Sequence, residues 1–98
     1  MSLHQRLQII RLRAGLTFPE LAIVFGSCRA AVQNWTYGKT LPVGLRGREA
    51  EHVAETLVAA VNRGLLPLPR MVDPAGRAAR VAKMREQLVV SFAKKLGE

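Results

Sequence analysis

Residues 17–37 read TFPELAIVFGSCRAAVQNWTY, two short helix-like segments divided by a glycine. Thr17 and Glu20 have the spacing of a capping box, in which the threonine caps the first amides of a helix and the glutamate reaches back. Gly26 can take the positive φ that ends this helix after Phe25. The stretch therefore predicts one helix up to Phe25, then a turn, then a second helix.

The second helix is expected over residues 28–37, with Gly38 after it. Ala22 has to be small because this helix crosses over it, whereas Val32 and Trp35 point back into the core. Such spacing holds two helices at the sharp angle of a helix-turn-helix, whose outer helix can enter the major groove of DNA. Trp35 could instead stack on a base, but its register with Val32 favours the core.

The sequence on either side also indicates helices, because no alternating strand pattern of useful length is present. Leu3, Leu7 and Ile10 lie on one face of a first helix, which Gly15 can end. A fourth helix is expected over residues 45–63. Its apolar face comprises Ala50, Val53, Ala54, Leu57 and Val61.

The C-terminal third begins with LLPLP at residues 65–69, which predicts a short, stiff, extended connector. Asp73 can cap a last helix that has Pro74 at its first position and reaches about Leu96. We therefore expect an all-α chain of three parts. They are a four-helix DNA-binding domain at 1–64, a connector at 65–73 and a C-terminal helix at 74–98.

Residues 7–42 resemble the lambda-repressor/Cro-type helix-turn-helix transcriptional regulators. The resemblance lies in Leu16-Thr17-Phe18-Pro19-Glu20-Leu21-Ala22, Gly26, Val32, Trp35 and Gly38-Lys39-Thr40-x-Pro42. It implies that base edges are read by Arg29, Ala30, Gln33 and Asn34. It implies phosphate contacts for Thr17, Tyr37, Lys39 and Thr40.

These residue types suit those tasks, because arginine can grip guanine, asparagine or glutamine can grip adenine, and alanine can touch a thymine methyl. Phosphate contacts fix the register of the protein on DNA without reading sequence. The alternative for Gln33 and Asn34 is that they are ordinary solvated polar residues.

The chain also departs from the family pattern. Phe18 stands where many relatives have a phosphate-binding glutamine, and it is expected to pack as a staple or core residue. Cys28 stands where a serine or threonine usually caps the second helix, so Ser27 or plain backbone geometry is expected to cap instead. Cys28 could act as a redox-sensitive thiol, or it could be a small filler. Beyond Pro42 the resemblance ends, since the connector replaces the short fifth helix of the family.

The charge is strongly basic: 15 Lys and Arg against 7 Asp and Glu give a net charge of +8. Residues 1–40 carry five bases and one acid, residues 65–98 carry seven and three, and residues 41–64 carry three of each. Two basic ends favour a polyanionic partner such as double-stranded DNA. A solubilising basic surface is the alternative.

No apolar run approaches the length of a membrane span, and the N-terminus lacks the apolar block of a signal peptide. A single cysteine, Cys28, suits a reducing compartment. We therefore expect a cytoplasmic protein, and the resemblance to the helix-turn-helix regulators implies that it is bacterial and nucleoid-associated.

Apolar residues fill about half of the circumference of the last helix. We expect this helix to contact the first domain and a second copy of the chain, through Val81, Leu88, Val89 and Phe92. Intramolecular packing alone and contact with a membrane surface are the alternatives. Arg85 intrudes on the apolar arc and has to snorkel or meet an acid.

Catalytic and metal-binding patterns are absent from the sequence. His4 and His52 have no neighbouring ligand or nucleophile, and Glu49, Glu51 and Glu55 are typical of a solvated helix face. With no paired carboxylates or metal-ligand spacing, we expect no enzyme activity, no metal, no cofactor and no small-molecule ligand.

The sequence as a whole predicts a homodimeric repressor of the phage, plasmid or mobile-element type, which binds an inverted-repeat operator through the major groove. Two other functions remain open. One is an architectural DNA-binding protein or excisionase-like recombination accessory protein, and the other is a protein-interaction module that does not bind DNA.

Overall fold

The computed structural model describes residues 1–68 and 73–97, and the elements it assigns over those residues are all helices. They are α1 (Leu3–Arg13), α2 (Phe18–Phe25), α3 (Arg29–Thr36), α4 (Gly44–Asn62) and α5 (Pro74–Leu96). The all-α prediction is therefore confirmed, and the expected helix ends agree within two residues. Part of the predicted connector, residues 69–72, lies outside the described residues, as does Glu98.

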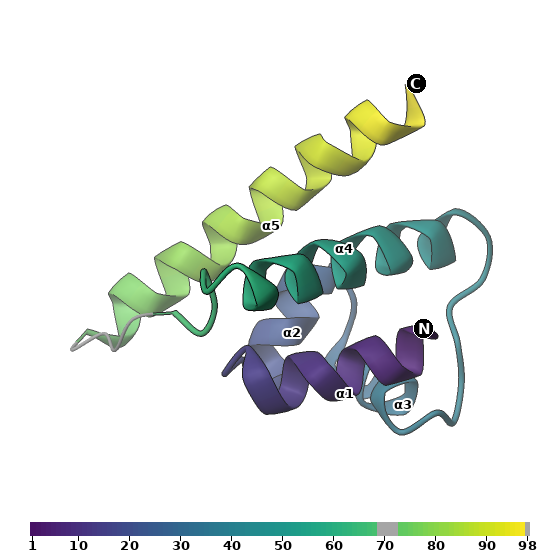
Figure 1. Cartoon of the computed structure of the whole chain (residues 1–98), viewed down its shortest axis with the longest axis horizontal. Coiled ribbons are helices and arrows are strands. Elements are labelled where there is room, and N and C mark those ends of the chain that lie inside the picture. Colours follow the sequence, from purple (N-terminus) through teal and green to yellow (C-terminus); the bar gives the residue numbers. More distant parts are fainter. Residues whose placement is uncertain (69–72, 98) are drawn as a thin grey trace.

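The helices form two sides of the molecule. The short helix α3 packs on α1 and α2, whereas α5 packs on α2 and α4. In Figure 1, α5 therefore crosses above α4, and α3 lies at the opposite edge, below α1.

Side-chain caps start α1, α2 and α5, and a glycine ends α2. The Ser2 hydroxyl accepts from the Gln5 amide at 3.2 Å, and the Gln5 side chain accepts from the Ser2 amide at 2.9 Å. Asp73 accepts from the Ala75 amide at 3.0 Å, which confirms it as the cap of α5. Gly26 ends α2 with φ of 65°, a conformation that is cheap only for glycine.

The core of the described residues is one cluster to which every helix contributes. Its fully enclosed side chains include Leu7, Ile10, Leu21, Val24, Val32, Val53 and Val81. Trp35 packs edge-on against Phe25, with ring centroids 6.2 Å apart. The prediction that Val32 and Trp35 point inward is confirmed.

The C-terminal helix α5 is part of this core. Val81, Leu88 and Phe92 are buried against the rest of their own chain, as is Leu66 just before the helix. The His52 ring lies 5.7 Å from that of Phe92, and its Nε2 is 2.8 Å from the Ser91 hydroxyl. His52 thus joins α4 to α5.

The N-terminal half of α5 is fixed to the start of α2 by Arg77. Its guanidinium donates to both carboxylate oxygens of Glu20 and, at 2.7 Å, to the carbonyl of Gly15. The hydrogen bond from Arg77, together with those from Thr17, lowers the pKa of the Glu20 carboxyl despite partial burial. The ion pair therefore joins the capping box of α2 to α5.

Arg85 fixes the middle of α5 to the other end of α2. It pairs with Glu49 of α4 at 2.7 Å and donates to the carbonyl of Val24 at 3.2 Å. A β-carbon built at Gly26 would lie 2.4 Å from the Arg85 guanidinium, so the turn after α2 and this side chain are in close contact. Arg85, the charged residue on the apolar arc of α5, therefore pairs with an acid, as expected.

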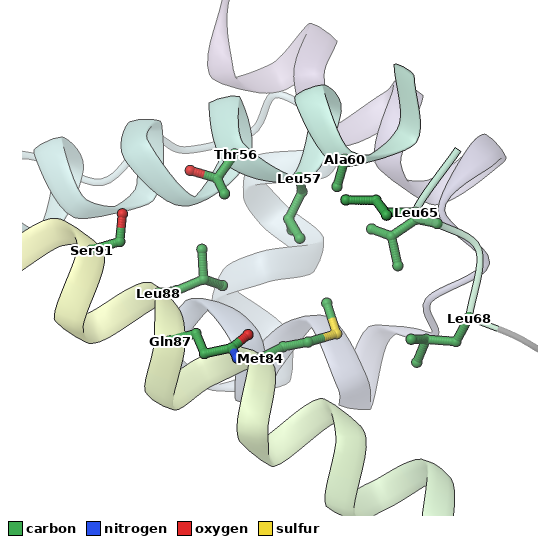
Figure 2. Close-up of a pocket in the computed structure, with 10 residues that line it drawn as sticks. Thr56, Leu57, Ala60, Leu65, Leu68, Met84, Gln87, Leu88 and Ser91 are labelled. Carbon is green, nitrogen blue, oxygen red and sulfur yellow. The ribbon is translucent and has the colours of Figure 1, made fainter. Parts of the chain in front are cut away.

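An apolar pocket lies between α4, residues 65–68 and α5 (Figure 2). It has a volume of about 350 Å³. Leu57, Leu65, Met84 and Leu88 are among the side chains that surround it (Figure 2). The pocket lies on the side of the molecule that carries α5, away from α3. In the part of the chain that the structure describes, no helix is long and apolar enough to cross a membrane.

Candidate nucleic-acid interface

One face of α3 is buried and the other is presented to solvent. Val32, Trp35 and Thr36 are buried, and they anchor the helix to the core. The four predicted base readers lie together on the opposite side, as the period of 3.6 residues requires. Arg29 and Ala30 are exposed, whereas Gln33 and Asn34 are half-buried.

The C-terminal end of α3 is held rigidly. The Gln8 side chain donates to the carbonyl of Thr36 at 2.7 Å, which joins α1 to this end of the helix. The Lys39 amide donates to the carbonyl of Asn34 at 2.9 Å. His4 packs beside Gly38, and its Nδ1 is buried without a hydrogen-bond partner among the described residues.

The predicted phosphate-binding residues divide into two groups. Tyr37, Lys39 and Thr40 follow α3 directly and are exposed, so their side chains can reach a ligand that lies along this helix. Thr17 is also exposed, but its polar groups serve the cap of α2. Its hydroxyl accepts from the Glu20 amide at 3.3 Å, and its own amide donates to the Glu20 carboxylate at 2.9 Å.

The start of α2 is therefore poorly suited to an anion. Pro19 has no N–H, the Glu20 amide is used by Thr17, and the Glu20 carboxylate adds negative charge. A phosphate contact at Thr17 would compete with these bonds, which form the capping box that the sequence predicts.

Phe18 takes a structural position between three helices. It is only 8% exposed, which agrees with its expected packing role. Its ring meets Tyr37 edge-on with centroids 6.0 Å apart, and the guanidinium carbon of Arg11 lies 4.0 Å from its centroid. Phe18 thus contacts both Arg11 of α1 and Tyr37, the residue that follows α3. Arg11 was not among the predicted contact residues, since its contact with Phe18 joins side chains of two different helices.

The start of α3 has no side-chain cap. Cys28 precedes the helix, is exposed, and makes no capping hydrogen bond. The Ser27 hydroxyl accepts from Arg46 at 2.8 Å instead. Plain backbone geometry therefore starts α3, one of the two expected alternatives.

Several cations of residues 1–40 carry no counter-charge in the described part of the chain. Over the described residues, the acids pair with Arg6, Arg77, Arg85 and Lys95. No such ion pair involves Arg11, Arg13, Arg29 or Lys39. Because Glu20 is the only acid in residues 1–40, this side of the molecule is positively charged.

The predicted dimerisation residues need a correction. Val81, Leu88 and Phe92 face the chain's own core, so they are not available to a second copy, and only Val89 is exposed, at 45%. The reason is that an apolar arc shows which side of a helix avoids water but not which neighbour covers it.

The surface that α5 does expose forms a different set. These residues, here called the outer face of α5, recur at intervals of three and four. They are Ala75, Ala79, Ala82, Glu86, Val89, Ala93 and Leu96, all exposed. This spacing is that of a heptad seam, in which mostly apolar positions repeat every seven residues.

No group of three or more His, Cys, Asp or Glu side chains that could hold a metal ion occurs within residues 1–68 and 73–97. No protein-family model, curated protein or solved structure matches the chain significantly.

Proposed function

We propose that the chain is a sequence-specific, non-catalytic regulator of transcription that inserts α3 into the major groove of double-stranded DNA. One observation carries this proposal. The buried face of α3 is anchored in the core. Four side chains that are able to read base edges lie on its other face, where cations without an acidic partner also occur. A rigid scaffold beneath an exposed polar helix is what major-groove readout requires.

In this proposal the residues of α3 divide their tasks by chemistry. Arg29 offers a planar fork to guanine, and Asn34 and Gln33 offer paired donor and acceptor groups to adenine. Ala30 can contact a thymine methyl. Lys39 meets the phosphate backbone together with Tyr37 and Thr40, so affinity depends on salt.

The proposed regulator acts as a homodimer. The outer face of α5 pairs with its copy, because it is an unpartnered seam with heptad spacing on the side of the molecule remote from α3. Two-fold symmetry then presents two copies of α3 to an inverted repeat, and occupancy of such an operator represses by excluding polymerase.

A selection from random duplexes at near-physiological salt tests the proposal. Recovery of a short inverted repeat is the expected result, since each α3 reads one half-site. Salt-sensitive binding without any recovered motif would replace the proposal with an architectural DNA-binding function. A chain that binds no duplex at all would leave protein interaction as the function.

A further inference from the structure

We infer that Arg11 is a DNA-backbone contact of its own, held by the ring of Phe18, which also meets Tyr37. This inference deepens the proposed function and rests on it. The bond it adds is a charge-assisted hydrogen bond from the Arg11 guanidinium to a phosphate oxygen. It places the DNA backbone across the end of α1 as well as along α3.

The first step is the position of the guanidinium. Arg11 lies with its guanidinium carbon 4.0 Å from the centroid of the Phe18 ring, a cation–π contact. Phe18 is itself held in place by burial and by its edge-on contact with Tyr37. The Arg11 side chain is therefore ordered before any ligand arrives, which reduces the entropy lost on binding.

The second step is chemical. An arginine that lies on an aromatic ring can use its face for that contact and keep its five N–H donors, which lie in the plane, for another partner. Phosphate oxygens match that planar fork in two parallel bonds. Among the hydrogen bonds of the described residues, none has the Arg11 side chain as donor.

The third step is the absence of a competing acid. Glu20 is the only carboxylate in residues 1–40 and lies two residues from Phe18 in sequence. Arg77 from α5 occupies both oxygens of that carboxylate. The charge of Arg11 is thus left for an external anion.

The fourth step is location. Tyr37 directly follows α3, and the Phe18 ring that it meets also carries the Arg11 guanidinium, so Arg11 lies on the flank of the helix that we propose enters the groove. In this inference, a backbone strand that meets Tyr37 and Lys39 also reaches Arg11. The polar groups of Thr17 already form the cap of α2. In this inference, Arg11 therefore makes the phosphate contact near the start of α2.

The test uses Arg11→Ala with Arg13→Ala as its matched control. Both variants remove one positive charge from the last turn of α1, but two residues of a helix are about 200° apart, so only Arg11 lies over Phe18. Affinities for a selected operator duplex and for a random duplex are measured by fluorescence anisotropy between about 50 and 300 mM salt.

We expect Arg11→Ala to weaken binding to both duplexes by roughly fivefold to tenfold and to lower the salt slope by about 0.9. Arg13→Ala should change affinity by less than about twofold. Equal losses for the two variants would overturn the inference, because the effect would then be general charge. Unchanged binding by Arg11→Ala would also overturn it while leaving the proposed function intact.

A second variant tests the positioning by the ring. Phe18→Leu keeps an apolar side chain in the site but removes the cation–π contact, so Arg11→Ala should cost less in this background than in the unsubstituted chain. A full, additive loss would remove Phe18 from the inference. If the unsubstituted chain shows no salt-sensitive binding to any duplex, the proposed function is contradicted, and the inferred Arg11 contact is contradicted with it.

Discussion

Glu20 joins three contacts in one side chain. It completes the cap of α2, pairs with Arg77, and in doing so holds α5 against the start of α2. Its pKa is lowered chiefly by the hydrogen bond from Arg77, so the folded chain binds this proton less tightly than the unfolded chain does. Its contribution is thus complete above the ordinary glutamate pKa of about 4.3 and is lost as the pH falls through the lower folded value.

We therefore expect Glu20→Gln to lower the free energy of unfolding at pH 7 by about 1–2 kcal/mol, because Arg77 loses its charged partner. The difference from the unsubstituted chain should shrink toward zero between about pH 5 and pH 2, where the native carboxyl also becomes neutral. Urea denaturation followed by circular dichroism measures both. Glu55→Gln, at an exposed glutamate of α4 whose ion pairs are 3.6 Å or longer, is the control, and a difference independent of pH would contradict the expectation.

Arg29 and Lys39 offer a comparison of two single-charge removals on the same surface. Arg29→Ala should cost about 1–3 kcal/mol on the selected operator and relax specificity at one base position, because Arg29 is placed to read a base edge. Lys39→Ala should weaken specific and random duplexes alike and reduce the salt slope by about one. Binding assays on both duplexes check this. If Lys39→Ala altered the sequence preference, the assignment of Lys39 to the phosphate backbone would be wrong.

Local spacing was enough to predict some residues and not others. The cap made by Thr17 and Glu20 and the buried positions of Val32 and Trp35 follow from separations of a few residues, so the sequence shows them. The Arg11–Phe18 contact joins two helices, and no pattern along the chain specifies it. Arg77 is similar, since its acid lies 57 positions away.

The helix α5 braces α2 at both ends. Arg77 meets the start of α2, whereas Arg85 donates to the carbonyl of Val24 near its end and pairs with Glu49 of α4. Since α2 and α3 pack together, this brace also stabilises the position of the proposed reading helix. The C-terminal helix, which the sequence assigns to a separate part of the chain, therefore belongs to the structure that positions α3.

Loss of the Arg85 contacts should lower the free energy of unfolding. Arg85→Ala leaves Glu49, whose side chain is only 28% exposed, without its partner, so we expect unfolding to become easier by about 1–3 kcal/mol. Arg80→Ala removes the same charge from an exposed position of α5 and should change stability by less than about 0.5 kcal/mol. Thermal and urea denaturation compare the two, and equal effects would show that Arg85 does not brace α2.

The helices themselves were predictable because each starts or stops at a local signal, such as Asp73 before α5 or Gly26 after α2. Which side of α5 faces the core could not be predicted from the sequence. Its apolar residues cover more than one side, and only the packed chain decides that Val81 and Leu88 turn inward while Val89 stays outside.

The whole molecule places its two proposed surfaces far apart. α3 lies at one edge, and α5 lies on the opposite side (Figure 1). A dimer through α5 would therefore not cover α3. The geometry is compatible with two reading helices that act on one inverted repeat.

Val89→Asp tests that assembly without disturbing the core. A carboxylate in an apolar seam should give a monomer of 10.8 kDa in sedimentation experiments, where the unsubstituted chain is expected to have twice that mass. Affinity for the full repeat should fall more than tenfold, while affinity for a half-site stays the same. Gln87→Asp, on another side of α5, is the control. An unsubstituted chain that is already monomeric would end the dimer proposal.

Trp35 is the only tryptophan in the chain, and it is 5% exposed against Phe25. Its indole is shielded from water for as long as α2 and α3 stay packed, so its intrinsic emission should lie at short wavelength and resist soluble quenchers. Opening of the junction between the two helices should shift that emission to the red. The ring points inward, away from Arg29 and Asn34. The emission of Trp35 is therefore a label-free reporter of the packing of α2 on α3, and DNA bound to the exposed face of α3 should leave it unchanged.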